Sequence, residues 1–360
     1  MISEYKLINI FLILLFSLSS CREESVKYSS FSGLTQGTTY SMIFEDKGNI
    51  TAEELRSRVE KILRDFDMSL SIYEDSSIVS KINRNETVIP DSFFTAVFIK
   101  AKSINILTEG AFDITVSPFV KAWGFGPDAV RNFRESVRDS LLMLVGMGKV
   151  DLQEGMLIKT DPRVSLDFNA IAQGFSVDVI CSFFDRLDMN SYLVEIGGEV
   201  RVKGDKNGTR WRIGIDRPEE NNMIPGDDLQ AIINMKDRSL ATSGNYRKFY
   251  VEDGVKYSHT IDPKTGYPAR NTLLSATILA DDCATADAVA TACMVKGKDA
   301  AIEFLNRNPE FEGFLVYSDE SGNFRTWTSE SLKKYISESR SYYSDYRKRV
   351  SALVPWFRKK

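Results

Sequence analysis

The chain has 360 residues, of which 43% are hydrophobic and 27% are charged, and its formal net charge is −4. These values are typical of a soluble globular protein, and the slight excess of acids argues against a nucleic-acid binder. The single histidine, His259, excludes a zinc site built from several histidines. Carboxylates, hydroxyls and carbonyl oxygens remain as ligands, and these suit Mg²⁺ and phosphate chemistry.

The amino terminus has the pattern of an export signal. Lys6 precedes an apolar run over residues 7–18, which is too short for a comfortable membrane-spanning helix. The sequence Leu18-Ser19-Ser20-Cys21 resembles the bacterial lipobox. We therefore expect residues 1–20 to be removed, Cys21 to carry lipid, and residues 21–32 to form a tether on the periplasmic side of a bacterial membrane. The alternative is an ordinary cleaved signal in which Cys21 is incidental.

Helix and strand patterns alternate through residues 33–330, with no linker rich in Pro, Gly or Ser. Apolar residues at helical spacing predict helices over residues 51–66, 92–107, 128–145, 169–187 and 285–295, the first one capped by Thr51. Alternating patterns predict strands over residues 39–45, 192–196, 211–215, 229–234, 249–252, 274–280 and 314–317. Successive strands between residues 192 and 280 favour antiparallel pairing. The predicted fold is α+β: a single compact domain with a mixed, largely antiparallel sheet flanked by helices.

Two loops between these elements can bind a ligand. Residues 110–115 contain Asp113 and are followed by Trp123 and Phe125 among glycines and a proline, which suits a flat ring such as flavin or adenine. The alternative is a loop that packs on the core, with Asp113 as a cap. Residues 166–174 lead into a helix that Asp167 or Asn169 would cap, and its first N–H groups would bind an anion or nothing.

Shorter motifs carry less information by themselves. Gly197-Gly198 predicts a hairpin turn, and residues 242–246 form a polar turn that suits phosphate. Of the cysteines after Cys21, Cys181 and Cys293 are predicted to be small core residues.

Asp287 and Thr291 are spaced i, i+4 and so lie on one face of a predicted helix, among small alanines. A carboxylate next to a hydroxyl suits a hard divalent cation that also binds a carbonyl and phosphate oxygens. The alternative is an Asp that stabilises the helix start and a Thr that bonds to the preceding turn.

The carboxy-terminal tail, residues 331–360, carries nine Lys or Arg against Glu338 and Asp345, a net charge of +7. Trp356 and Phe357 lie among these charges. Such a segment can rest on an anionic membrane surface, or it can be a solvated helix with a frayed end.

In this order, the motifs resemble the FAD:protein FMN transferase (ApbE) family from about residue 37 to residue 327. The resemblance is carried by residues 37–40, 71–73, 110–113, 123–126, 166–174, 196–198, 242–246, 258–268 and 286–291. It implies FAD contacts at Tyr40, Tyr73, Ala111, Phe112, Asp113, Asp167, Gln173 and Ile261. It also implies Mg²⁺ ligands at the Ala170 carbonyl, Asp287 and Thr291. Gln173 departs from the Lys that many members carry, and Asn169 from their Gly.

The resemblance implies Mg²⁺-dependent transfer of FMN from FAD to a Ser or Thr hydroxyl of a target protein, with release of AMP. The target would be an exported electron-transfer subunit with a short acceptor motif. His259 is our candidate general base, although Asp113 competes and His259 could instead orient the turn at Asp262. Two alternatives stay open: an Mg²⁺-dependent FAD pyrophosphatase that gives FMN and AMP, and a flavin-binding lipoprotein without catalysis.

Overall fold

The computed structural model describes residues 26–127, 133–219, 222, 226–245, 249–252 and 255–338. The predicted signal peptide, Cys21 and the tail after residue 338 lie outside the described residues. Within them, no helix is long and apolar enough to cross a membrane.

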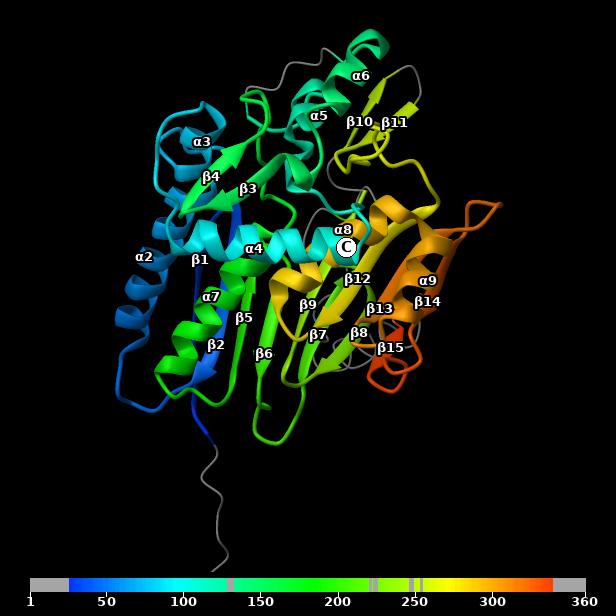
Figure 1. The fold of residues 1–360 in the computed structure, drawn as a ribbon. Helices are drawn as coiled ribbons and strands as arrows, with labels where there is room; N and C mark the ends of the chain where they lie inside the picture. The colour runs from blue at the N-terminus through cyan, green and yellow to red at the C-terminus, as the bar shows by residue number, and fades with distance from the viewer. Residues whose placement is uncertain are drawn as a thin grey trace, which may run out of the picture.

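An eight-stranded sheet forms the centre of the molecule (Figure 1). Every neighbouring pair in it is antiparallel, in the order β1-β2-β5-β6-β9-β12-β13-β14. The strands are β1 (Tyr28–Thr35), β2 (Thr38–Glu45), β5 (Tyr192–Ile196), β6 (Glu199–Lys203), β9 (Arg238–Gly244), β12 (Leu273–Ala280), β13 (Glu312–Ser318) and β14 (Phe324–Thr328).

The remaining described strands form three small sheets. The first has the order β15 (Ile336–Glu338), β8 (Leu229–Met235), β7 (Trp211–Asp216), and it shares an apolar cluster with one face of the main sheet. The other two are hairpins: β3 (Val150–Gln153) with β4 (Met156–Lys159), and β10 (Phe249–Glu252) with β11 (Val255–Ser258).

Helices cover the opposite face of the main sheet, and α4, α7 and α8 lie in front of it in Figure 1. The helices are α2 (Ala52–Leu70), α3 (Ile78–Asn83), α4 (Ser92–Leu107), α5 (Ser117–Ala122), α6 (Glu135–Leu142), α7 (Ala172–Arg186), α8 (Cys283–Lys296) and α9 (Lys298–Arg307). Helix α8 is rich in alanine and buried nearly all round, because it packs on β9 and β12 while α4 and α7 pack on it. It is therefore the central helix of the fold.

The predicted elements between residues 39 and 317 are confirmed in kind. Helix α4 has the predicted bounds, and Thr51 caps α2 by accepting a hydrogen bond from the Glu54 N–H at 3.1 Å. Residues 128–132 of the third predicted helix lie outside the described residues, and the rest of it contains α6. The predicted turn at Gly197-Gly198 joins β5 to β6 as a hairpin.

The predicted cap of α7 is wrong. The Asp167 carboxylate accepts the N–H of Asn169 at 2.8 Å, which closes a tight turn ahead of the helix. Helix α7 then begins at Ala172, after Ile171, and no side chain caps it. Two of its first N–H groups are bonded in other ways: Ala172 donates to the Phe168 carbonyl at 2.8 Å and Gly174 donates to Asp287 at 3.1 Å.

Described strands lie on both sides of the predicted domain of residues 33–330. Residues 28–32, expected in the tether, belong to strand β1, where Phe31 packs on Tyr40 and Phe44. At the other end, Leu332 is fully buried against the small sheet and β15 pairs with β8. The short alternation of apolar residues in a serine-rich segment was too weak to predict β1.

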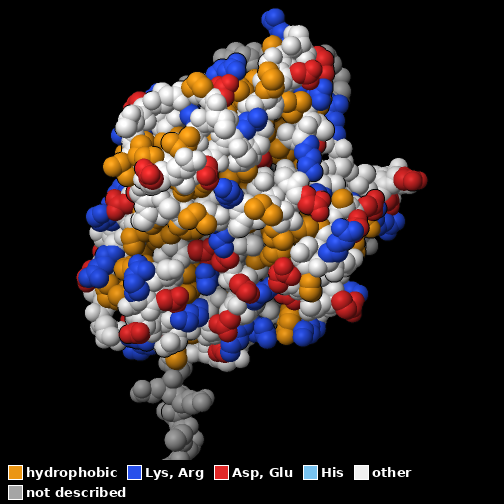
Figure 2. All heavy atoms as spheres, in the orientation of Figure 1, with side chains coloured by type: hydrophobic (Ala, Val, Ile, Leu, Met, Phe, Trp, Pro, Cys, Tyr) orange, Lys and Arg blue, Asp and Glu red, His pale blue; other side chains and the backbone are white. Residues whose placement is uncertain are grey.

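Cys181, Cys283 and Cys293 are all buried and unpaired, so the prediction that Cys181 and Cys293 are core residues is confirmed. On the surface, basic and acidic side chains are intermingled over the helical face (Figure 2). Apolar side chains also reach this surface, including Ile99 and Ile106 on α4.

Helices α7 and α8 approach each other closely at Gly174. A Cβ atom on this glycine would lie 2.4 Å from the carbonyl oxygen of Cys283 and 2.8 Å from the Cβ of Asp287. The first of these atoms belongs to a backbone, which cannot move aside without displacing the helix.

We expect Gly174→Ala to destabilise the protein by about 2 kcal/mol, because the added methyl group forces α7 and α8 apart. Gly148→Ala is the matched control, because a Cβ there meets no atom within 4 Å. Urea unfolding of both variants measures the difference. Equal stability of the two variants would show that the helices are not in tight contact.

Candidate active site

The predicted site residues gather around one end of the main sheet. This end contains the β1–β2 turn, the β5–β6 turn, the end of β9, the start of α7 and the end of α2. Two further segments adjoin it: the loop before α5 and the hairpin that follows β11. Loops from distant parts of the sequence therefore meet where the sheet and its helices end.

Asp287 is a buried carboxylate on α8, with 7% of its surface exposed. Its Oδ2 accepts a hydrogen bond from the Gly174 N–H at 3.1 Å. Burial raises the pKa of Asp287 to about 7, although the Gly174 N–H opposes this shift. Among the described residues, no Lys or Arg forms an ion pair with this carboxylate. A buried negative charge without a cation is costly, so the site favours binding a positive ion.

Ala170 lies just ahead of α7, whose first intrahelical bond runs from the Phe175 N–H to the Ile171 carbonyl. The Gly174 N–H belongs to the first turn and has no acceptor within the helix, so it is available to donate to Asp287. No described group is found to donate to the Ala170 carbonyl. A carbonyl oxygen just before the helix and a carboxylate bonded to its first turn are thus both present at the start of α7.

Thr291 lies one turn after Asp287 on α8, and its hydroxyl is 3.1 Å from the hydroxyl of Ser243 on β9. Thr291 therefore bonds across to β9 rather than only to the preceding turn of its own helix. The described residues contain no group of three His, Cys, Asp or Glu side chains that could hold a metal. The available donors are one carboxylate, hydroxyls and a carbonyl, and this set fits Mg²⁺ when phosphate oxygens complete it.

Tyr73 and the loop before α7 lie side by side. Tyr73 is 61% exposed, and burial together with the charge of Asp167 raises the pKa of its hydroxyl, while a hydrogen bond with Asn169 lowers it. The Asp167 N–H donates to the carbonyl of Ile114 at 2.7 Å. The structure thus brings together the predicted FAD contacts Tyr73 and Asp167 and the loop of Asp113.

Asp113 has a structural role as a cap. Its two carboxylate oxygens accept four hydrogen bonds: from the N–H and hydroxyl of Thr115, the N–H of Met147 and the amide of Asn105. Ala111 and Phe112 are buried beside it. This loop therefore offers backbone groups, rather than free side chains, to a ligand. Burial raises the pKa of Asp113 while the four donors lower it, and the donors occupy the oxygen lone pairs through which it would take a proton.

Gln173 lies against the turn between β5 and β6. Its Nε2 atom would be 2.6 Å from a Cβ on Gly197, which has φ +66°. A side chain at position 197 is therefore excluded both by space and by backbone conformation. The neutral amide of Gln173 is held at the mouth of the site, where many family members were expected to carry a Lys.

Gln36 is a site residue that the sequence did not single out. It lies in the β1–β2 turn with φ +50°, and its Oε1 is 3.4 Å from the Ser176 hydroxyl on α7. Its Nε2 is buried and faces the carboxyl of Asp67, in a geometry that falls short of a normal hydrogen bond. A weakly held amide in this turn is a candidate ligand contact. The available signal was its position directly before the Gly37 to Tyr40 motif.

Tyr40, a predicted FAD contact, has a side chain that lies in the core. Its side chain is fully buried, and its hydroxyl donates to Glu60 of α2 at 2.8 Å. Its ring packs under Gly33, where a Cβ would lie 2.7 Å away. Tyr40 joins the sheet to α2, and its side chain has no surface open to FAD.

His259 follows β11 in a hairpin that returns through Pro268. Its ring is partly exposed and lies 6.4 Å from the ring of Phe125. The turn at Asp262 is held by its own hydrogen bonds, because the carboxylate accepts from the N–H of Lys264 and the hydroxyl of Thr265. The Asp262 turn therefore has support from its own residues.

The hairpin is fixed to the rest of the site by aromatic contacts. Trp123 donates its indole N–H to the carbonyl of Gly266 at 2.8 Å, and Ile261 is buried with Phe119 and Trp123. Lys264 passes 3.7 Å from the position of a Cβ on Gly110. These contacts bring the His259 segment beside the loop of residues 110–113. They bury the Ile261 side chain, so its predicted contact with FAD would be through the backbone.

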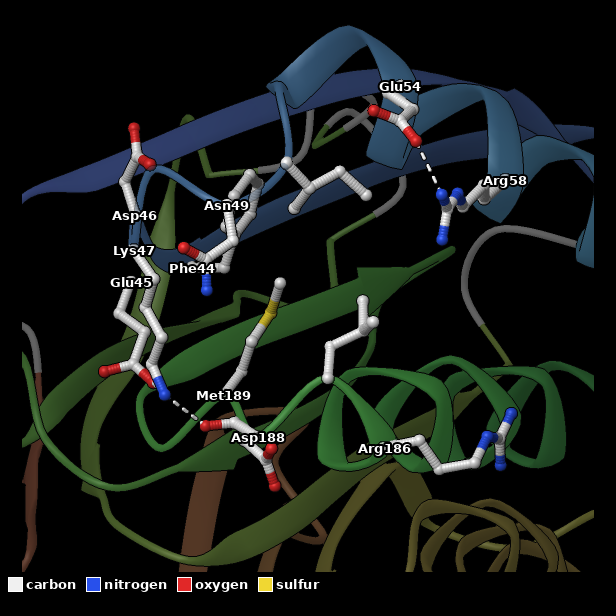
Figure 3. A pocket seen from close by; sticks show the side chains of 12 residues that line it. Phe44, Glu45, Asp46, Lys47, Asn49, Glu54, Arg58, Arg186, Asp188 and Met189 are labelled. Carbon is white, nitrogen blue, oxygen red and sulfur yellow. Dashed lines mark hydrogen bonds and ion pairs between the residues drawn. The ribbon is translucent and has the colours of Figure 1, made fainter.

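A hollow of about 340 Å³ lies at the other end of the molecule (Figure 3). Its lining comes from the end of β2, the start of α2 and the end of α7, including Lys47, Arg58 and Asp188. None of the predicted site residues lines it. Gln173 and Arg186 are near opposite ends of α7, which separates the hollow from the site by about 20 Å of helix.

Comparison with known proteins is consistent with this geometry. The chain matches the ApbE family over residues 36–315. It is 36% identical to the FAD:protein FMN transferase of Haemophilus influenzae, over 88% of this chain and 94% of that protein, and 33% identical to that of Vibrio cholerae, over 89% and 96%.

Solved structures agree. The flavin transferase ApbE from Vibrio cholerae superposes with a TM-score of 0.77 at 32% identity, covering 86% of this chain and 99% of that one. The apo flavinyl transferase ApbE from Pseudomonas stutzeri gives 0.77 at 30% identity, covering 86% and 97%. The chain belongs to the ApbE family.

Asp67, near the end of α2, supplies a test of the electrostatics around the site. Burial raises the pKa of this half-buried carboxyl from 3.8 to about 6, the facing Gln36 amide opposes the shift, and Glu74 adds to it. The folded protein then holds a proton that the unfolded chain has lost. Ionised Asp67 therefore costs stability as the pH rises from about 4 to above 6.

We expect Asp67→Asn to be more stable than the parent protein at pH 8, by about 1 kcal/mol after allowance for solvent screening, and to lose this advantage at pH 4. Urea unfolding of the variant and the parent protein at pH 8 and pH 4 measures this difference in stability. Asp65→Asn on the same helix removes only an exposed pair with Lys61 and should give no gain. If Asp67→Asn were less stable than the parent protein at pH 8, ionised Asp67 would not cost the folded protein stability.

Proposed function

We propose that this chain transfers the FMN moiety of FAD to a Ser or Thr hydroxyl of an exported protein, in an Mg²⁺-dependent reaction that releases AMP. Its family membership supports the transfer of FMN from FAD to a protein. The observation that carries the metal dependence is the arrangement of Gly174, Ala170 and Asp287. There a buried carboxylate, which has no ion-pair partner among the described residues, bonds to the first turn of α7, shortly after the Ala170 carbonyl.

In the proposed step, one phosphorus–oxygen bond forms and another breaks. The hydroxyl oxygen of the target attacks the phosphorus on the flavin side, and the bond from this phosphorus to the bridging oxygen breaks. The bridging oxygen leaves with AMP, while the hydroxyl proton passes to a base on the enzyme. Mg²⁺, held by Asp287, Thr291 and the Ala170 carbonyl, would neutralise phosphate charge and make AMP a better leaving group.

The chain's own residues provide the rest. The start of α7 offers a phosphate its helix dipole and the N–H of Gln173, because the N–H groups of Ala172 and Gly174 are already bonded. Tyr73 and the backbone at residues 111–113 adjoin the same region. His259 is the proposed proton acceptor, because Asp113 already accepts four hydrogen bonds and the Asp262 turn has its own support.

We expect His259→Asn to lower the rate of FMN transfer at least about a hundredfold, because a general base contributes a factor of this order. FAD binding, followed by flavin fluorescence, should change little. Arg270→Gln is the control in the same hairpin, since Arg270 packs on the ring of Tyr257 and leaves the imidazole untouched. If His259→Asn kept nearly full activity, His259 would not be the general base.

We expect Asp287→Ala to abolish metal-dependent turnover while Asp281→Asn, an exposed change just ahead of α8, leaves it nearly intact. Each protein is incubated with FAD and Mg²⁺, with and without a protein that bears the acceptor motif, and the products are weighed. A mass gain of one FMN less water on the acceptor, with free AMP, supports the transferase. Free FMN and AMP without labelled acceptor would point to the pyrophosphatase. FAD that stays intact in the reaction of the parent protein would favour the alternative of a flavin-binding protein without catalysis.

We also propose that the mature protein is anchored by lipid on Cys21 and faces the periplasm. The lipobox-like sequence supports this, together with the direction of β1. The Lys27 carbonyl accepts a bond from Asp46, beside the hollow of Figure 3, whereas the other end of β1 leads into the turn of Gln36 at the site. An anchor ahead of β1 would therefore direct the site away from the membrane and toward protein acceptors.

A further inference from the structure

The start of α8 has unusually complete capping. Three N–H groups at this end point to carboxylates: Cys283 and Ala284 donate to Asp178, and Thr285 donates to Asp282. Asp282 is the N-cap residue, directly before the helix, and its bond is the usual kind of N-cap. Asp178, by contrast, comes from α7, more than a hundred positions earlier in the sequence. A carboxylate from another helix therefore holds the start of α8.

The contacts of Asp178 have a defined geometry. Its Oδ1 accepts the Cys283 N–H at 3.0 Å and its Oδ2 accepts the Ala284 N–H at 2.9 Å. Arg201 of β6 donates from Nη1 to Oδ1 at 2.6 Å, which fixes the carboxylate from the sheet side. The Asp178 side chain is only 14% exposed. Each carboxylate oxygen thus has its own backbone donor, and the pair of bonds prevents rotation.

These bonds form the second of two links between α7 and α8. Gly174 and Asp178 are one turn apart on α7, and Cys283 and Asp287 are one turn apart on α8. The first link joins the Gly174 N–H to Asp287, and the second joins Asp178 to the start of α8. Two links one turn apart fix both the spacing and the axial register of the helices. This register sets where Asp287 and Thr291 lie relative to Ala170.

We propose that Asp178 is a positioning residue for the divalent-cation site, which it serves by holding the start of α8 in register with α7. This inference rests on the proposed function, because it assumes that Asp287 and Thr291 bind the cation. Asp178 itself does not contact the cation. Its loss would let α8 shift along α7, and the oxygen ligands would then no longer converge.

The chain contains a matched control for this proposal. Asp185 lies two turns after Asp178 on α7 and pairs with Lys203 of β6 at 2.8 Å, just as Asp178 pairs with Arg201 of β6. Among the described residues, the hydrogen-bond and ion-pair partners found for the Asp185 carboxylate are Tyr192 and Lys203, and neither belongs to α8. Replacing either Asp by Asn removes one carboxylate between the same helix and the same strand. Only Asp178→Asn affects the start of α8.

The test measures Mn²⁺ affinity by electron paramagnetic resonance of the free ion, for the purified parent protein, Asp178→Asn, Asp185→Asn and Asp287→Ala. FAD affinity without metal is measured in parallel by flavin fluorescence. We expect Asp178→Asn to bind Mn²⁺ at least about tenfold more weakly, which is the usual scale for a residue that orients a metal ligand. FAD affinity without metal should change less than about twofold, and Asp185→Asn should match the parent protein in both measurements.

The outcomes separate the two proposals. Weaker Mn²⁺ binding in Asp287→Ala and Asp178→Asn, but not in Asp185→Asn, supports the positioning role. Parent-like affinity in Asp178→Asn, or an equal loss in Asp185→Asn, overturns it and leaves the proposed function standing. Parent-like affinity in Asp287→Ala overturns the metal assignment and the positioning role together.

A second variant covers the case in which Asp178→Asn fails to fold. Arg201→Lys keeps the Asp178 carboxylate and replaces only the guanidinium that fixes it. We expect about threefold weaker Mn²⁺ binding in this variant, because a flexible ammonium group orients a carboxylate less well than a planar guanidinium. Unchanged affinity would overturn the positioning role.

Discussion

The contact between α7 and α8 is the constraint on which the rest of the site depends. It exists because position 174 has no side chain: the backbone of α7 lies directly on the carbonyl of Cys283, and its N–H reaches Asp287. The close approach also explains the alanines of α8, since larger side chains would hold the neighbouring helices and strands away. A dense, small-residue core thus brings a backbone donor within hydrogen-bond distance of a carboxylate that would otherwise be isolated.

This contact carries an electrostatic cost. Asp287 is buried, and among the described residues the only hydrogen bond shown for it is the one from the Gly174 N–H. The metal-free protein therefore holds a carboxylate whose charge is poorly compensated, and the raised pKa of Asp287 expresses the same fact. The fold can accept this cost because Asp178, Arg201, Asp282 and the sheet hold α8 in place around it. Stability and function thus use neighbouring parts of one helix pair.

The sequence predicted the elements with strong periodicity and the pair on α8. Asp287 and Thr291 could be found because a spacing of four residues on a helix is a local property. Other features depend on residues far apart in the chain: the bond from Gly174 to Asp287, the bond from Tyr40 to Glu60 and the two bonds from Asp178. No local pattern encodes these contacts. The cap of α7 was wrong for a related reason, because the Asp167 side chain satisfied a turn instead of the helix.

The two ends of the molecule differ in character, and the same elements that build the site connect them. Strand β2 and helices α2 and α7 each extend from the site to the hollow of Figure 3, so the two ends of the molecule are joined by continuous, buried secondary structure. The site end contains the partly exposed Tyr73 and His259 and the Gln36 amide, which faces Asp67. The opposite end carries close ion pairs, such as Arg58 with Glu54. Exposed aromatic and polar groups at one end and ion pairs at the other suit a protein that presents a reactive nucleotide to a second protein.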